Sequence, residues 1–191
     1  MNDSDPQLSV VAQELWDNDV NRLQPGKDYK ISLQGKAGFA QPGNDGNDGA
    51  FLPLFAFVDE NIFKKETFHA FISLLDNYES DAGEPEVVTP EEEFEIQRFL
   101  DSVMKTPIMK PDGNKHIMAL QFSWKNGIKP KGSIFIGVSP EFEFALYTLC
   151  FLTSPNERVK LSFSLYEVEI VCHHYNQKHI GTTYPVLIKY L

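Results

Sequence analysis

The hydrophobic pattern changes its period once along the chain, and this change restricts the folds that the sequence can adopt. Up to about residue 105, apolar side chains recur at the spacing of amphipathic helices. Past that point they alternate with polar residues, as in Met118, Leu120, Phe122 and Trp124, which is typical of a strand. Helices in front and strands behind predict an α+β fold.

Three helices are predicted in the front part. Asp5-Pro6 is a favourable helix start, with Asp as N-cap, and the helix that follows ends near residue 17. Residues 67–78 place a broad apolar face on a second helix. Thr89 and Glu92 have the spacing of a capping box, so a third helix begins there and ends before Pro107.

The back part is predicted to contain further strands and one helix. Residues 134–138 form a second, more buried strand, and Ser139 caps a helix that runs to about residue 152. That helix is apolar nearly all round, which predicts burial. Residues 159–173 and 181–188 are two further strand regions. Residues 29–33 alternate over too few positions to decide between a strand and an extended loop.

Charge and cysteine content narrow the setting of the protein. The net charge of the 191-residue chain is −10, with −12 in residues 1–110 and +2 in residues 111–191. A site for a polyanion is therefore compatible only with the back part. No run approaches the roughly 20 apolar residues of a membrane helix, so no membrane partner is expected. Two cysteines and the lack of signal-peptide features in the first residues favour a reducing compartment, and we expect a cytoplasmic protein.

Few residues form a recognisable reactive group. The sequence has no phosphate-binding glycine motif, no paired cysteine motif and no nucleophile elbow. His173 and His174 are adjacent on a predicted strand, so their side chains should point to opposite faces and cannot act together on one substrate. Cys172 is too close to them to complete a zinc site. The glycine-rich and acidic residues 42–49 lack the spacing of a calcium loop and are predicted to form a surface loop.

Two polar segments of the back part remain open to two interpretations. Residues 125–133 are a basic stretch predicted to form a loop between two strands, and residues 181–185 open the last strand. From the residues alone, both can be solvated surface segments. They can equally contribute to a binding site for an anion.

Several long motifs, in order along nearly the whole chain, are similar to one known family. They are residues 15–17 (LWD), 19–23 (DVNRL), 29–38 (YKISLQGKAG), 71–79 (FISLLDNYE), 87–92 (VVTPEE), 129–133 (KPKGS), 135–148 (FIGVSPEFEFALYT) and 180–185 (IGTTYP). With these motifs the chain resembles the EndoU family of uridylate-specific endoribonucleases.

The resemblance implies a manganese-dependent cleavage of single-stranded RNA 3′ to uridine, which leaves a 2′,3′-cyclic phosphate. Lys129 matches the lysine that supplies positive charge in the family. Ser133 and Thr182 match polar residues that recognise the uracil edge, and Tyr184 matches the aromatic residue that holds the nucleoside. The implied cofactor is Mn²⁺, and the implied partner is RNA that contains uridine.

The chain departs from the family pattern at its centre. The two histidine motifs that carry proton transfer in the family have no counterpart here. We therefore interpret residues 1–191 as one shortened EndoU-like domain. Its mainly helical front part is residues 1–106, a junction that lacks a central segment is residues 107–117, and the strand-rich back part is residues 118–191.

Three functional hypotheses follow from this departure. The chain could cleave RNA with an acid and a base supplied by another molecule, such as a full-length family member. It could bind uridine-containing RNA without cutting it. It could also pair with full-length family members through exposed apolar strand faces and regulate them.

Overall fold

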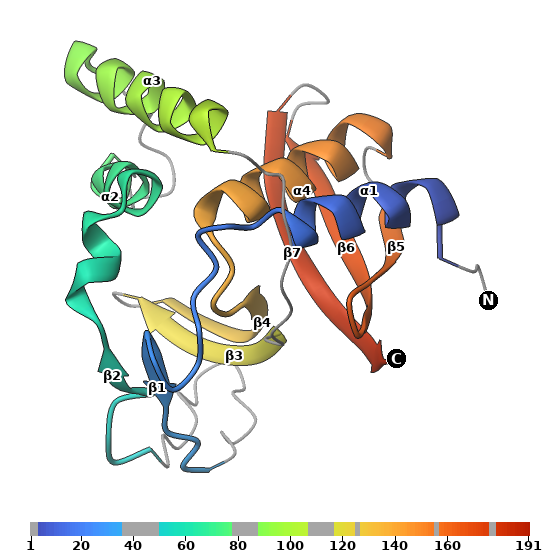
Figure 1. The fold of residues 1–191 in the computed structure, drawn as a ribbon, viewed down its shortest axis with the longest axis horizontal. Helices are drawn as coiled ribbons and strands as arrows, with labels where there is room; N and C mark the ends of the chain where they lie inside the picture. The colour runs from blue at the N-terminus through green and yellow to red at the C-terminus, as the bar shows by residue number, and fades with distance from the viewer. Residues whose placement is uncertain are drawn as a thin grey trace.

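The computed structural model describes residues 4–35, 50–77, 88–106, 117–124, 127–154, 157–175 and 179–191. Within these ranges, only the backbone is described for residues 117–124, 127–132, 175, 179 and 180. The architecture is α+β, as the sequence predicts. A three-stranded sheet covered by two helices forms one end of the molecule, and smaller strand pairs and helices form the other (Figure 1).

The main core lies between this sheet and the two helices. The antiparallel sheet has the order β5 (Arg158–Phe163), β6 (Tyr166–Tyr175) and β7 (His179–Tyr190), and the helices are α1 (Pro6–Asp17) and α4 (Pro140–Thr153). Trp16 of α1 lies at its centre, with ring centroids 5.6 Å from Phe142 and 5.5 Å from Phe163. Each fully buried side chain of this size contributes about 1.5–3 kcal/mol to folding.

The helix signals of the sequence are realised in both core helices. Asp5 Oδ1 accepts hydrogen bonds from the backbone N–H groups of Gln7 and Leu8, at 3.0 and 2.9 Å, and α1 ends at Asp17 as predicted. Ser139 Oγ accepts from the backbone N–H of Phe142 and begins α4. The prediction that this helix is buried all round is wrong, because Leu152 is 73% exposed near its C-terminal end.

The predicted strand region 159–173 is in fact two strands. β5 and β6 form an antiparallel hairpin whose turn is Ser164 and Leu165. Ser164 has a φ of +52°, a conformation that Gly or Asn usually supplies in such turns. The sequence therefore carries no turn signal at this point, and the two strands read as one.

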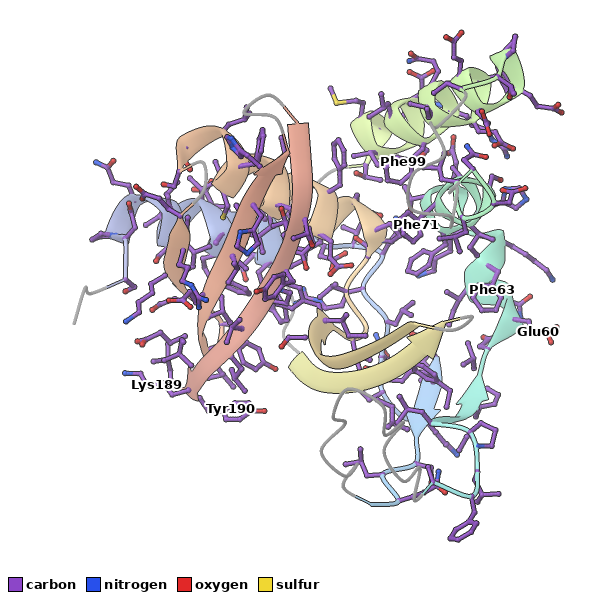
Figure 2. The ribbon with its side chains drawn as sticks, turned by 180° about the vertical axis from the view of Figure 1, so that it is seen from behind. Glu60, Phe63, Phe71, Phe99, Lys189 and Tyr190 are labelled. Atoms are coloured by element: carbon purple, nitrogen blue, oxygen red, sulfur yellow. The ribbon has the colours of Figure 1, made fainter. Side chains whose placement is uncertain are left out.

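The front part contains a smaller second cluster. An antiparallel pair, β1 (Tyr29–Ile31) and β2 (Phe55–Val58), is followed by a 3₁₀ turn, η1 (Glu60–Lys64), and by α2 (Glu66–Ser73) and α3 (Pro90–Lys105). Phe71 and Phe99 face one another between α2 and α3, with ring centroids 5.9 Å apart (Figure 2). Residues 29–33 thus include a short strand.

The boundaries of α2 and α3 test two predictions. The capping box of Thr89 and Glu92 is formed, and α3 ends at Lys105, before Pro107, as predicted. α2 is shorter than the predicted helix of residues 67–78, because it ends at Ser73 in a tight turn. Asp76 and Asn77 follow this turn, and such side chains favour turns over helix interiors. Residue 78 and the predicted loop of residues 42–49 lie outside the described residues.

A third strand pair corrects the prediction of a basic loop. β3 (Ile117–Trp124) agrees with the predicted strand, but β4 (Gly127–Phe135) includes most of the segment predicted as a loop. The predicted strand of residues 134–138 ends already at Phe135. Lysines, glycines and a proline conceal the strand in the sequence, and pairing with β3 forms it nevertheless. β4 also contacts β7 of the main sheet (Figure 1).

In the part of the chain that the structure describes, no helix is long and apolar enough to cross a membrane. The junction predicted at residues 107–117 lies outside the described residues, apart from Ile117 at the start of β3.

Candidate functional site

Lys129 lies at a β-bulge in β4. Lys129 pairs with Phe122 and Gly132 pairs with Leu120, so Pro130 and Lys131 both oppose the single residue between these partners. A bulge tolerates a proline within a strand, because the extra residue leaves the hydrogen-bonding ladder. Bulges also redirect side chains and are frequent beside active sites. Lys129 is placed here by its backbone alone.

A second bulge lies beside Thr182 in β7. His173 of β6 pairs with Thr182 and His174 pairs with Ile180, so Gly181 is the extra residue. Thr182 and Tyr184 are two positions apart on the strand and therefore share one face of the sheet. This is the face opposite to the core, and Thr182 is exposed on it.

The four predicted site residues thus lie on two strands that contact one another. Ser133 of β4 pairs with Ala119 and is partly exposed, and Tyr184 of β7 is half-buried. Because β4 contacts β7, the fold brings the two motif segments of the back part to one region. The prediction that these residues bind substrate receives no direct test from this arrangement.

The outer face of the main sheet carries ion pairs beside these residues. Arg158 donates to Glu169 Oε2 at 2.8 Å, and Lys189 lies 3.2 Å from Glu167 Oε2 at the other end of the face. The carboxylate of Glu169 raises the pKa of Arg158 above its usual value. Figure 2 shows Lys189 and Tyr190 at the far end of β7.

His173 was not assigned to this site from the sequence. The prediction that His173 and His174 point to opposite faces agrees with their contacts: the His173 ring lies 6.3 Å from that of Tyr184, whereas the His174 ring lies 4.4 Å from that of Phe151 in α4. Pairing register brings His173 opposite Thr182, and register is not visible in a single strand. No sequence signal could have found this contact.

The longest motif of the sequence forms a buried polar junction with the segment after α1. Asp19 Oδ2 accepts a hydrogen bond from Ser139 N at 3.0 Å, and Asn21 Nδ2 donates to Glu141 Oε1 at 2.6 Å. Asp19 is only 4% exposed, and burial raises its pKa from 3.8 to about 6. These contacts fix the start of α4 relative to the chain before β1, so these motif residues have a structural role.

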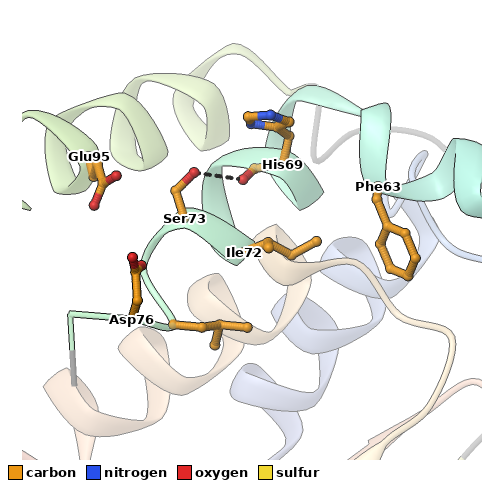
Figure 3. Close-up of a pocket in the computed structure, with 7 residues that line it drawn as sticks. Phe63, His69, Ile72, Ser73, Asp76 and Glu95 are labelled. Atoms are coloured by element: carbon orange, nitrogen blue, oxygen red, sulfur yellow. Dashed lines mark hydrogen bonds between the residues drawn. The ribbon is translucent and has the colours of Figure 1, made fainter. Parts of the chain in front are cut away.

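A pocket of about 710 Å³ lies between α2 and α3 (Figure 3). Phe63, Ile72 and Leu75 give it an apolar lining, and the polar groups at its edge are those of His69, Ser73, Asp76 and Glu95. The Ser73 hydroxyl donates to the backbone carbonyl of His69 at 3.2 Å. The side chains of Ser73 and His69 are therefore not arranged as a nucleophile and its base.

Metal ligands do not gather in the described residues. Among them, no group of three or more His, Cys, Asp or Glu side chains could hold a metal ion. The acids nearest to one another, Asp19 and Glu141, already accept hydrogen bonds from Ser139 and Asn21.

The fold and the motif strands define a class of protein, a nucleic-acid-cleaving α+β domain. The chain matches the family model "Endoribonuclease XendoU" over residues 7–111 and 110–185. It is 54% identical to uridylate-specific endoribonuclease B of Danio rerio, over 100% of this chain and 99% of that protein. This alignment extends over 280 residues, whereas the present chain has 191.

Other relatives agree. Poly(U)-specific endoribonuclease-B of Xenopus laevis is 37% identical, over 95% of this chain and 94% of that protein. The solved structure of XendoU, described as a splicing independent snoRNA processing endoribonuclease, matches with a TM-score of 0.80 and 34% identity, covering 99% of both chains. The chain belongs to the XendoU family of endoribonucleases, which confirms the resemblance seen in its motifs.

Proposed function

We propose that this chain recognises uridine-containing single-stranded RNA and that its ability to cleave the RNA is impaired or absent. One observation carries the proposal: the strands with the recognition motifs, β4 and β7, are formed and contact one another, while both family histidine motifs are missing from the sequence. Relatives named as uridylate-specific endoribonucleases support the substrate class.

The proposed recognition assigns one role to each of four residues. Tyr184 stacks on the uracil ring, which typically contributes about 1–3 kcal/mol per base in single-stranded complexes. Thr182 and Ser133 hydrogen-bond the uracil edge, and Lys129 pairs with the phosphate. Positive charge beside the phosphate also stabilises the charge that develops during cleavage.

Cleavage to a 2′,3′-cyclic phosphate needs two proton transfers. A base removes the proton of the 2′-hydroxyl, which attacks phosphorus, and an acid protonates the departing 5′-oxygen. Each group contributes about 10²–10⁴-fold to the rate. A chain that lacks both therefore keeps the binding groups and loses most of its rate.

Two observations support the absence of a central segment. The family match comes in two stretches that meet at residues 110 and 111. The alignment with the Danio rerio relative is longer than this chain although it covers all of it. We place the missing segment between α3 and β3, in the junction of residues 107–117.

Manganese belongs to the proposal only through the family resemblance. The described residues do not offer a set of ligands for it, so no step here is assigned to the metal. We further infer a cytoplasmic, reducing location, which is supported by the two cysteines, Cys150 and Cys172, both buried and unpaired.

A second candidate function is the regulation of full-length family members by pairing. Exposed apolar side chains on α3 favour it, since Phe94 is 69% and Met104 83% exposed. Salt separates the two functions. RNA binding should weaken steeply as salt rises, whereas apolar pairing should not.

The experiment that tests the proposal compares the binding of hexauridylate and hexacytidylate by fluorescence anisotropy. We expect a preference for hexauridylate that Tyr184→Ala reduces by about tenfold, the effect of losing one stacked base. Tyr190→Ala, an exposed tyrosine at the far end of the same strand, is the matched control and should bind as the wild type does. Equal binding of the two RNAs, or an unchanged Tyr184→Ala variant, would refute the proposal.

A further inference from the structure

The outer face of the main sheet places a third side chain beside Thr182 and Tyr184. His173 pairs with Thr182 in the ladder between β6 and β7, so the two side chains lie on the same face. The imidazole of His173 is exposed, and its ring centroid lies 6.3 Å from that of Tyr184. Histidine, phenol and hydroxyl groups thus adjoin on one exposed surface.

The neighbouring rung of the sheet adds a positive charge. Val171 pairs with Tyr184 on one side and with Arg158 on the other. Val171 is buried, so it forms an apolar floor between the two longer side chains. The guanidinium of Arg158 is exposed and held by Glu169. A ligand seated on Tyr184 would therefore have nitrogen donors of Arg158 and His173 close by.

We propose that His173 is a further nucleotide-binding residue of this chain and that its imidazole binds the phosphate attached to the nucleoside held by Tyr184. The inference rests on the proposed function, because that function places the nucleoside on Tyr184. Imidazole presents N–H donors that suit phosphate oxygens, whereas the stacking surface for the base is already provided by the tyrosine ring. His174 is excluded from this role because it contacts Phe151 on the core side.

The test compares two probes that differ only in the phosphate, uridine and uridine 3′-monophosphate. Their affinities are measured by calorimetry for the wild type, His173→Ala and Tyr184→Ala, with His69→Ala as a control for an exposed histidine on α2. We expect His173→Ala to weaken binding of the monophosphate about tenfold, as for a hydrogen bond to a charged group, and to leave uridine unaffected. His69→Ala should bind both probes as the wild type does.

A direct readout of contact accompanies the affinities. The ring signal of His173, assigned by its loss in His173→Ala, should shift in the NMR spectrum on addition of uridine 3′-monophosphate and remain in place with uridine alone. Equal losses for both probes would mean that His173 only supports the tyrosine ring, which would overturn the phosphate role.

The outcomes separate this inference from the proposed function. If Tyr184→Ala loses uridine while His173→Ala binds the monophosphate normally, the proposed function stands and the role of His173 is refuted. If the wild type binds neither probe, or if Tyr184→Ala binds both normally, the proposed function fails and the inference fails with it.

Discussion

Gly137 lies in the turn between β4 and α4, where its φ is +86°. A β-carbon at this position would lie 2.7 Å from Tyr29 Oη and 3.3 Å from the carbonyl oxygen of Leu23. The carbonyl of Gly137 also accepts a hydrogen bond from the backbone N–H of Leu23 at 2.6 Å. Glycine at this point therefore allows the chain before β1 to approach the start of α4.

We predict that Gly137→Ala lowers the free energy of unfolding by about 2–4 kcal/mol, because backbone strain and the contact with Tyr29 act together. Gly26→Ala is the matched control, since Gly26 has a φ of +81° but no atom within 4 Å of the added carbon. The control should lose only about 1–2 kcal/mol, from strain alone. Urea unfolding of both variants measures the difference. Equal losses would show that the contact with Tyr29 costs nothing.

Asp19 links stability to pH. Its pKa is about 6 in the folded chain because burial disfavours the charged carboxylate, against 3.8 for an exposed aspartate. Between these values the folded state holds a proton that the unfolded state has lost. Stability from this group is therefore greatest below pH 4 and decreases as the pH rises to 6, by on the order of 3 kcal/mol in total.

Asp19→Asn should remove most of this pH dependence, because asparagine retains an acceptor for Ser139 and carries no charge. The measurement is the free energy of unfolding in urea at several values between pH 4 and 7, for wild type and variant. The wild type should show the steeper loss. Parallel curves would contradict the assignment of the raised pKa to Asp19.

At the scale of elements, α1 covers the outer edge of β5. The backbone N–H of Asp5 donates to the carbonyl of Lys160, and Ser9 Oγ accepts from the N–H of Ser162, both at 3.0 Å. Gln13 Oε1 accepts from the N–H of Ser164 one helical turn further on. An uncovered edge strand is a template for association with other chains, and the helix removes this hazard.

We predict that Ser9→Ala costs about 1 kcal/mol in the free energy of unfolding, since the N–H of Ser162 loses its acceptor. Val10→Ala, an exposed position in the same helix, should change stability by less than about 0.5 kcal/mol. Thermal unfolding monitored by circular dichroism compares the two. A Ser9→Ala variant as stable as Val10→Ala would mean that the contact at the strand edge does not contribute.

The elements show which parts of the fold are predictable from sequence. α1, α3 and α4 are predictable because local signals, the caps at Asp5, Thr89 and Ser139, mark their beginnings. β4 is not, because its lysines, glycines and proline lack strand character and its pairing with β3 decides its structure. The turn at Ser164 is hidden for the same reason, since its φ of +52° is imposed by the hairpin.

The candidate site shows the same division. Lys129, Ser133, Thr182 and Tyr184 are found by motif, because the family resemblance rests on local runs of residues. His173 is not found, because its place beside Tyr184 depends on the pairing of β6 with β7 and on the bulge at Gly181. Register between strands is a long-range property that no local pattern encodes.

At the scale of the molecule, charge and missing chemistry fit one account. The acidic front part carries −12 and the back part, with β4 and β7, carries +2. Long-range attraction of RNA is therefore restricted to the back part, where all the proposed nucleotide contacts lie. The lack of an acid and a base at the same site predicts binding without efficient turnover.

The most direct test of this account is one assay in which binding and cleavage of a uridine-containing RNA are followed together, with manganese present and in a sample shown to be folded. The account predicts RNA binding that Lys129→Ala weakens, and no formation of a 2′,3′-cyclic phosphate product. Cleavage 3′ to uridine that is lost in Lys129→Ala would contradict it, because a group outside the family histidine motifs would then be supplying the proton transfers.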